Sequence, residues 1–82
     1  MPQTVLTLYT RQHCHLCEQA KQAINELKND YLFRLEVIDI DQSDELTERY
    51  GLMIPVVLIN GEEAAFGQIN KFILSNRLQE EF

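Results

Sequence analysis

Basic residues and long apolar runs are scarce in this chain of 82 residues. Seven lysines and arginines stand against thirteen aspartates and glutamates, which gives a formal net charge of −6. Binding to a phosphate backbone needs a clustered basic surface. The seven basic side chains are scattered along the sequence, so we expect no nucleic-acid partner. No apolar run approaches the roughly 20 residues that a membrane-spanning helix needs, so we expect no membrane partner either.

A secretory signal is also missing. Residues Met1 to Val5 have neither the basic start nor the apolar stretch of such a signal, which favours a cytoplasmic location. Cysteine occurs only twice, and both copies lie in the tetrapeptide Cys14-His15-Leu16-Cys17. A bond between them would close almost no loop and would stabilise the fold little. In a reducing compartment such a close pair indicates redox chemistry or a metal site.

The composition is that of one ordinary globular domain. Hydrophobic residues make up 45% of the chain and charged residues 24%, as in typical folded proteins. No internal repeat, low-complexity tract or flexible linker divides the sequence. We therefore predict a single domain over residues 1–82, because this length can build one small core but not two.

The apolar pattern predicts four strands and three helices. Short runs of β-branched or alternating apolar residues indicate strands, and apolar positions repeating every three or four residues indicate helices. The expected strands cover residues 5–9, 32–40, 56–59 and 62–66. The expected helices cover residues 14–28, 43–50 and roughly 70–78.

Particular side chains should begin, end or anchor these elements. Ser43 is the expected N-cap of the second helix, and Gly51 is expected to end it in a left-handed conformation. The pair Asn60-Gly61 predicts a tight hairpin between the last two strands. The first helix should be anchored on one face by Leu16, Ala20, Ala23, Ile24 and Leu27. The last helix should be anchored by Phe72, Ile73 and Leu78.

The resulting order, β-α-β-α-β-β-α, predicts an α/β fold. The first two strands are joined by a helix long enough for a right-handed parallel crossover. The last two are joined by a tight hairpin and must be antiparallel. A four-stranded mixed sheet with helices on both faces satisfies both connections. This is the arrangement of the thioredoxin fold.

Cys14 and Cys17 lie three positions apart at the start of the first predicted helix. That spacing can meet the Cα separation of about 4.4–6.8 Å that a disulfide needs. Cys14 falls at the N-cap, where unpaired backbone N–H groups and the helix dipole stabilise a thiolate. We therefore expect Cys14 to attack a disulfide and Cys17, on the buried side, to resolve the mixed disulfide. Two helical cysteines without a chemical role are the alternative.

A metal site is the other alternative for this pair. His13 and His15 could join the two cysteines as ligands, and the chain has no other Cys or His. Structural zinc usually takes a second ligand pair from a distant segment, and four ligands from five consecutive residues would be strained. We therefore expect no metal in the monomer. A metal or iron–sulfur cluster shared by two subunits through Cys14 stays open.

Three side chains that can carry positive charge flank the pair. A partly protonated ring at His13 or, within the motif, His15 would lower the pKa of Cys14; otherwise both are exposed loop histidines. Arg11 either binds a substrate carboxylate or is a solvated arginine. These three outnumber Glu18 near Cys14. Local charge matters because salt shortens the long-range repulsion between this acidic chain and an anionic substrate to about 8 Å.

Two segments of the chain resemble glutaredoxins. The run from Leu8 to Cys17 is similar to the active-site segment of glutaredoxins and of the glutaredoxin-like proteins of bacteria. Met53-Ile54-Pro55-Val56 is similar to the second hallmark of that family, a bulky residue followed by a cis proline opposite the cysteines. The spacing of the Asn60-Gly61 turn and of Gly67 also fits. The resemblance covers about residues 4–79.

The resemblance implies thiol–disulfide exchange, with Cys14 as the attacking thiol and Cys17 as the resolving thiol. It implies a cis bond before Pro55, although residue chemistry alone would favour an ordinary trans proline at an edge strand. It also implies that the backbone of Ile54 pairs with the substrate as an added strand.

The chain departs from the glutaredoxin pattern in two places. His15-Leu16 replaces the usual Pro-Tyr between the cysteines, which leaves the first helical turn less rigid. In glutaredoxins a Gly-Gly pair followed by acidic residues binds the γ-glutamyl group of glutathione, whereas here Gly67 is followed by Gln68 and, later, Asn70. These amides could bond the same group without charge, and charge-assisted bonds are about twice as strong. The use of glutathione therefore stays open.

These observations predict a glutaredoxin-like thiol–disulfide oxidoreductase that reduces protein disulfides or glutathione mixed disulfides. We expect a monomer with no bound cofactor and with glutathione as a candidate reductant. The expected substrate-binding residues are Arg11, His15, Ile54, Pro55, Gly67 and Gln68. Two other functions stay open. One is a non-catalytic thioredoxin-fold binding module that holds a partner at Ile54 and Pro55, and the other is a dimeric metal or iron–sulfur carrier.

Overall fold

The structure, a computed structural model, describes residues 3–81. Met1, Pro2 and Phe82, which the prediction of a single domain includes, lie outside the described residues. The strands are β1 (Val5–Thr10), β2 (Arg34–Asp39), β3 (Val56–Ile59) and β4 (Glu62–Phe66). The helices are α1 (His15–Leu27), α2 (Asp44–Tyr50) and α3 (Lys71–Gln79), with a short 3-10 turn, η1 (Ile40–Gln42), before α2. None of the helices within residues 3–81 has the length and apolar character needed to cross a membrane.

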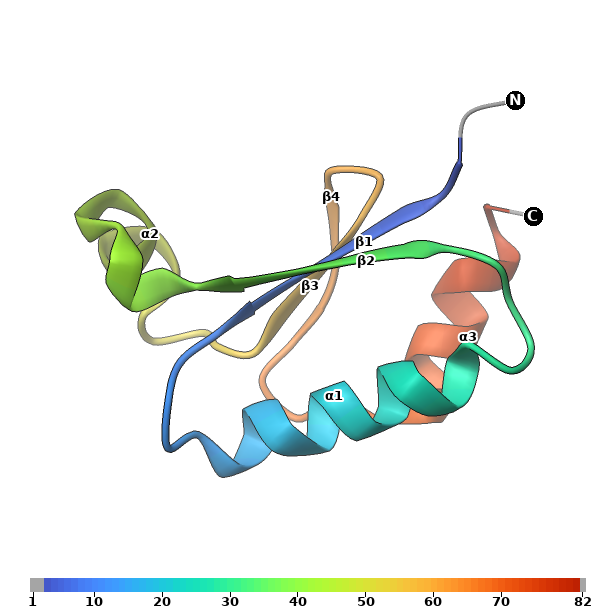
Figure 1. The fold of residues 1–82 in the computed structure, drawn as a ribbon, viewed down its shortest axis with the longest axis horizontal. Helices are drawn as coiled ribbons and strands as arrows, with labels where there is room; N and C mark the ends of the chain where they lie inside the picture. Colours follow the sequence, from blue (N-terminus) through green and yellow to red (C-terminus); the bar gives the residue numbers. More distant parts are fainter. Residues whose placement is uncertain (1–2, 82) are drawn as a thin grey trace.

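The four strands form one mixed sheet in the order β2-β1-β3-β4 (Figure 1). β1 and β2 are parallel, and α1 connects them. β3 is antiparallel to both β1 and β4. Asn60 and Gly61 both have positive φ, 52° and 86°, as a two-residue hairpin turn requires. The predicted α/β class, mixed sheet and hairpin are confirmed.

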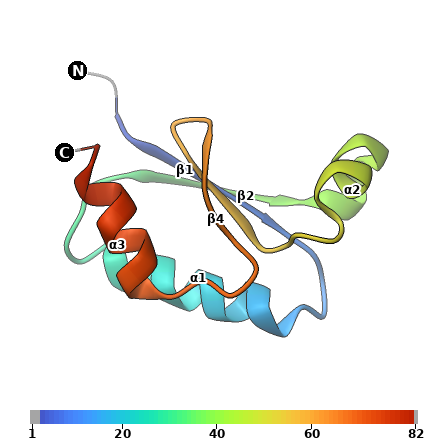
Figure 2. The same ribbon diagram turned by 180° about the vertical axis from the view of Figure 1, so that it is seen from behind.

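Helices cover both faces of this sheet. One face, which includes Leu6 and Leu8 of β1, packs against α1 and α3 and forms the larger part of the core. Figure 2 shows these two helices on the same side of the sheet and α2 at the other end of the molecule. On the opposite face, Tyr50 at the end of α2 packs against Val56 and Leu58 of β3. The second layer is therefore small and covers only the end of the sheet nearest α2.

The end of α2 differs from the prediction. Gly51 has φ −55° and ψ −29°, which is right-handed helical backbone, so the predicted left-handed conformation is wrong. A steric constraint explains why residue 51 is glycine, because a Cβ at this position would collide with the carbonyl oxygen of Thr47. The predicted N-cap is confirmed, since the Ser43 side chain accepts the N–H of Leu46. β2 is also shorter than expected, because η1 begins at Ile40.

The predicted helix anchors are partly wrong. Leu16 is 38% exposed, and Cys17 takes the buried position in the first turn of α1. In α3, Phe72 is 74% exposed and Ile73 is 39% exposed, whereas Leu74 and Leu78 are fully buried. Leu74 and Leu78 are one turn apart and share the stripe that faces the sheet. Phe72 and Ile73 precede that stripe and lie off it.

Candidate active site

One end of the sheet brings together three segments that are far apart in the sequence. β1 continues directly into the loop that leads to Cys14. Tyr9 pairs with Val56, so Pro55, one residue earlier, lies at this same end. The N–H of Gly67 donates to the carbonyl oxygen of Pro55 over 2.8 Å. The cysteine loop, the proline and the glycine therefore border one site.

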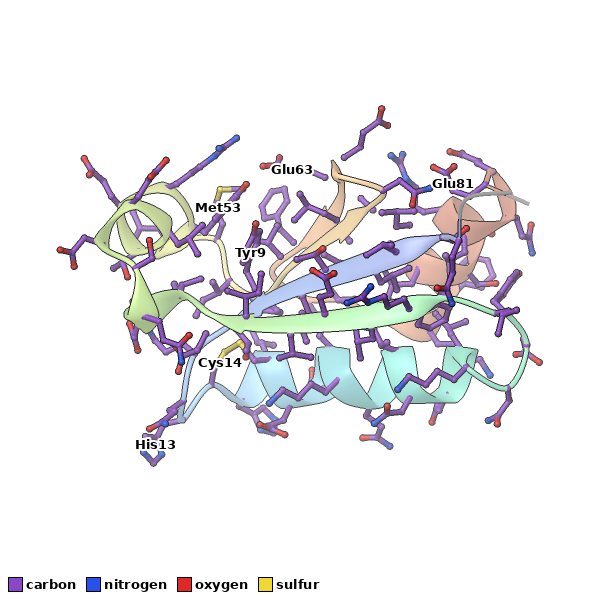
Figure 3. The ribbon with its side chains drawn as sticks, turned by 45° about the horizontal axis from the view of Figure 1, so that its top comes forward. Tyr9, His13, Cys14, Met53, Glu63 and Glu81 are labelled. Carbon is purple, nitrogen blue, oxygen red and sulfur yellow. A yellow bond between two sulfur atoms is a disulfide. The ribbon has the colours of Figure 1, made fainter. Side chains whose placement is uncertain are left out.

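The two cysteines form a disulfide across the first turn of α1, with their Cα atoms 5.1 Å apart (Figure 3). Cys14 is the N-cap of α1, as predicted, and its Sγ accepts the backbone N–H of Cys17 over 3.2 Å. The side chain of Cys17 is fully buried, whereas Cys14 is half-buried. In the dithiol state the same N–H and the helix N-terminus would stabilise negative charge on Cys14.

The peptide bond between Ile54 and Pro55 is cis, which confirms the expectation from the family resemblance. The Pro55 side chain is fully buried. The N–H of Ile54 donates to the carbonyl oxygen of Tyr50 over 3.1 Å. A substrate strand that paired with this N–H would have to displace that bond.

The two histidines beside the cysteines have different surroundings. His13 is exposed with φ 58°, and Figure 3 shows its side chain pointing into solvent, away from Cys14. His15 is also exposed, and its Nε2 lies 3.2 Å from Nε2 of Gln19, one turn along α1. No group of three or more His, Cys, Asp or Glu side chains in residues 3–81 is arranged to hold a metal ion.

Arg11 is held by an acidic side chain from a different segment. Its Nε and Nη2 each lie 3.0 Å from Oδ1 of Asp41, in η1. The backbone N–H of Asp41 in turn donates to Oδ1 of Asp39 over 2.9 Å. Arg11 therefore already has a carboxylate partner. The sequence-based interpretations, a substrate-binding or a solvated arginine, did not include this partner.

A groove of about 500 Å³ opens beside this ion pair, between the first turns of α1 and the end of β2. Glu18 and Lys21 on its α1 side form an ion pair over 3.4 Å. Thr10 is buried at the groove, and its hydroxyl has no hydrogen-bond partner among the described residues. The full lining consists of Thr10, Arg11, Gln12, His13, Glu18, Lys21, Val37, Asp39 and Gln42.

The segment after β4 supplies fewer polar groups than the sequence suggested. Gly67 has φ 74°, a conformation that favours glycine. Gln68 is exposed and lines a second groove of about 300 Å³ together with Phe66 and Ile73. Oδ1 of Asn70 accepts the N–H of Ile73 and caps α3, so this oxygen is already bonded. Gln68 is therefore the exposed side-chain amide next to Gly67.

Two tyrosines pack against the proline segment on the face of the sheet that α2 covers. No sequence pattern had indicated a role for either tyrosine. The rings of Tyr9 and Tyr50 stack with centroids 4.7 Å apart. The carbonyl oxygen of Tyr50 accepts the N–H groups of both Met53 and Ile54. Burial raises the pKa of Tyr50 above the usual 10.0, Arg49 lowers it, and nearby Glu63 and Tyr9 raise it further.

Asp41 is a further residue near the site that sequence reasoning missed. Thirty positions separate it from Arg11, so no local motif connects them. The parallel register of β1 and β2 pairs Thr10 with Asp39, which brings the residues that follow both strands to the same edge. The contact between Arg11 and Asp41 could have been predicted if the register of these two strands had been known.

Comparison with known proteins gives the chain a family. The family model of the glutaredoxin-like domain (DUF836) matches residues 5–81. A structural genomics target protein from X. campestris, solved by X-ray diffraction, is 32% identical, with 92% of this chain and 96% of that chain covered and a TM-score of 0.79. The protein Ne2328 from Nitrosomonas europaea, solved by NMR, is 28% identical, with 94% and 93% covered and a TM-score of 0.79.

A more distant structure supports the fold alone. A mutant thioredoxin from Halobacterium salinarum is 19% identical, with 95% of this chain and 74% of that chain covered and a TM-score of 0.73. The thioredoxin fold is thus shared at low sequence identity. With a family model that spans nearly all of its residues, this chain belongs to the glutaredoxin-like domain family (DUF836).

Proposed function

We propose that the chain is a thiol–disulfide oxidoreductase that cycles Cys14 and Cys17 between dithiol and disulfide. The asymmetry of the pair carries this proposal. Cys14 is half-buried at the helix N-terminus, and its Sγ accepts a backbone N–H, whereas Cys17 is fully buried. One sulfur is accessible and stabilised as a thiolate, and the other is shielded from external disulfides. Membership in a glutaredoxin-like family supports the same reaction class.

In the first step, the Cys14 thiolate attacks the substrate disulfide. A bond forms between Cys14 Sγ and one substrate sulfur, the substrate S–S bond breaks, and the departing thiolate takes a proton from solvent. A free thiol titrates at about 8.5, and a helix N-terminus lowers that pKa. Cys14 therefore supplies thiolate at neutral pH.

In the second step, Cys17 loses its proton to solvent and attacks Cys14 Sγ. The bond between Cys14 and the substrate sulfur breaks, and the second substrate thiol leaves. The Cα atoms of the pair are already 5.1 Å apart, within the range of protein disulfides, so ring closure needs no large backbone movement. The substrate disulfide is reduced to two thiols, and the cysteine pair is oxidised.

We propose protein disulfides and glutathione mixed disulfides as substrates, and an external thiol such as glutathione as reductant, with no bound cofactor. The proposed substrate-binding residues are Pro55 and Gly67, which lie at the end of the sheet where β1 leads to the cysteine loop, together with Gln68, Ile54 and His15. The cytoplasm, whose thiol pool regenerates dithiols, is the proposed compartment.

The experiment that tests this function is turnover of a glutathione mixed disulfide, with glutathione, glutathione reductase and NADPH as the electron source. Oxidation of NADPH should be rapid with the native chain and absent with Cys14→Ser. Asn25→Ser, an exposed change further along α1, is the control and should keep native turnover.

Other results would favour other functions. No turnover in a chain whose cysteines still oxidise and reduce reversibly would exclude glutathione and point to another reductant. No disulfide exchange with any thiol would contradict the proposal and favour a binding module. Iron in a purified, coloured dimer would favour the iron–sulfur carrier.

A further inference from the structure

The two basic side chains that line the groove beside the cysteine loop are paired, one with a neighbour in α1 and one with a residue from another segment. Lys21 is paired with Glu18 over 3.4 Å, and Arg11 is paired with Asp41 over 3.0 Å. Asp39 lines the same groove. The sequence-based count, in which cations outnumber Glu18 near Cys14, left out Lys21 and the two aspartates that the fold brings to this edge.

The Arg11–Asp41 contact has the form of a carboxylate-binding site that is already filled. A guanidinium group presents a planar fork of N–H donors that suits a carboxylate. The Nε–H donates to Oδ1 of Asp41, and Nη2 lies 3.0 Å from the same oxygen. The bond from the Asp41 backbone N–H to Oδ1 of Asp39 holds the backbone from which this internal carboxylate projects. A substrate carboxylate that approached Arg11 would compete with a partner that is already in place.

We propose that Asp41 is a specificity-determining residue, which disfavours disulfides that carry a carboxylate close to the sulfur by occupying Arg11. Neutral and cationic disulfides would then be preferred over anionic ones, and glutathione mixed disulfides would be substrates of lower preference. This inference rests on the proposed function, since it concerns the attack of Cys14 on a disulfide. Asp41 acts through Arg11 and needs no contact with the substrate.

The expected effect is moderate because the pair is partly exposed. The side chains of Arg11 and Asp41 are 34% and 51% exposed, and solvent weakens such pairs. Releasing Arg11 should therefore change the preference for anionic disulfides by about threefold to fivefold. The change should shrink as salt is added, because ions screen exposed charges.

The test compares two disulfide probes on the reduced chain by stopped-flow absorbance. Dithiobis-nitrobenzoate carries a carboxylate on each ring, and dithiodipyridine carries none. With either probe, Cys14 forms a bond to one probe sulfur, the probe S–S bond breaks, and a coloured thiol is released. The ratio of the two second-order rates measures the preference for the anionic probe. Asp41→Asn should raise that ratio at low salt and leave the dithiodipyridine rate near the native value.

Two further variants separate this role from net charge and from general structure. Glu48→Gln changes the net charge by the same amount at an exposed position of α2 and should change the ratio little. The double variant Arg11→Gln/Asp41→Asn should show no gain over Arg11→Gln, because the gain needs a free guanidinium.

The inference is overturned if Asp41→Asn leaves the ratio unchanged, if Glu48→Gln raises it equally, or if the gain survives without Arg11. These results would leave the proposed function intact, provided that Cys14 reacts quickly with dithiodipyridine. If the native chain reacts with neither probe faster than free cysteine, the proposed function fails, and this inference fails with it.

Discussion

Cys14 and Cys17 differ in the two properties that decide the order of thiol exchange, namely access to solvent and stabilisation of a thiolate. Cys14 is half-buried at the N-cap, and its Sγ accepts the N–H of Cys17. Cys17 has no exposed surface. Under the proposed function, a disulfide in solution would therefore reach the first sulfur and not the second, which would react only with Cys14.

Cys17→Ser should trap the intermediate. Without the resolving thiol, Cys14 should form a stable mixed disulfide with glutathione, visible by mass spectrometry as one adduct per chain. Reactions that need only one thiol should continue. Cys14→Ser should form no adduct, because its remaining thiol is buried. If instead Cys14→Ser forms the adduct and Cys17→Ser does not, the assignment of the two roles is wrong.

Thr10 carries a polar side chain that is buried at the edge of the groove. Its hydroxyl is buried and has no partner among the described residues, and a buried polar group without a hydrogen bond lowers stability. Thr10→Val keeps the shape and removes the hydroxyl. It should raise the free energy of unfolding by about 1 kcal/mol, measured by urea denaturation. Thr7→Val, a half-buried change on the same strand, should have little effect, and destabilisation by Thr10→Val would contradict this account.

At the scale of elements, α2 holds the proline segment in place. The helix has only seven residues, too few to be stable alone. It is fixed at its start by the Ser43 cap and at its end by Tyr50, which stacks on Tyr9 and accepts two backbone N–H groups from residues 53 and 54. The geometry of Ile54 and Pro55 therefore depends on how Tyr50 packs.

Tyr50 should also make stability depend on pH in the alkaline range. Its pKa is raised above 10.0, mainly by burial, so the folded chain keeps the proton longer than the unfolded chain does. This contribution is fully present below the unfolded pKa and is lost as the pH rises through the folded pKa. Urea denaturation between neutral and strongly alkaline pH should show this decline, and Tyr50→Phe should reduce its slope. An unchanged slope in Tyr50→Phe would assign the decline to other groups.

At the scale of the whole molecule, stability comes mainly from the face of the sheet that α1 and α3 cover. Twelve buried residues form the cluster on that face, against three in the cluster on the α2 face. The site lies at the end of the sheet, where the loops after β1 and β4 and the proline segment meet. The core thus fixes the positions of these three segments, and the reactive and polar groups of the site come from the segments themselves.

The two faces of α3 should respond differently to truncation. Leu74→Ala removes a fully buried side chain and should lower the free energy of unfolding by about 2–5 kcal/mol. Phe72→Ala removes a larger side chain that is mostly exposed and should change it by about 0.5 kcal/mol or less. Urea denaturation of both variants measures the difference. Equal losses would show that Phe72 packs against the core after all.

The order of elements, the hairpin at Asn60-Gly61 and the position of Cys14 at the start of α1 could all be predicted from the sequence. Each of these follows from local rules: apolar periodicity, turn chemistry and capping. The cis bond at Pro55 came from family resemblance and not from these rules. Leu16, Phe72 and Ile73 were misplaced because several apolar residues within one or two turns leave the buried face undecided until neighbouring elements are packed.

Only the tertiary structure decided which polar groups near the cysteines are already bonded. Asp41 reaches Arg11 across thirty positions, the N–H of Ile54 bonds to Tyr50, and Asn70 caps α3 instead of facing a ligand. The sequence shows that these groups can donate or accept hydrogen bonds, and it does not show with which partner. Those partners depend on strand register and helix packing, which come from contacts distributed over the whole chain.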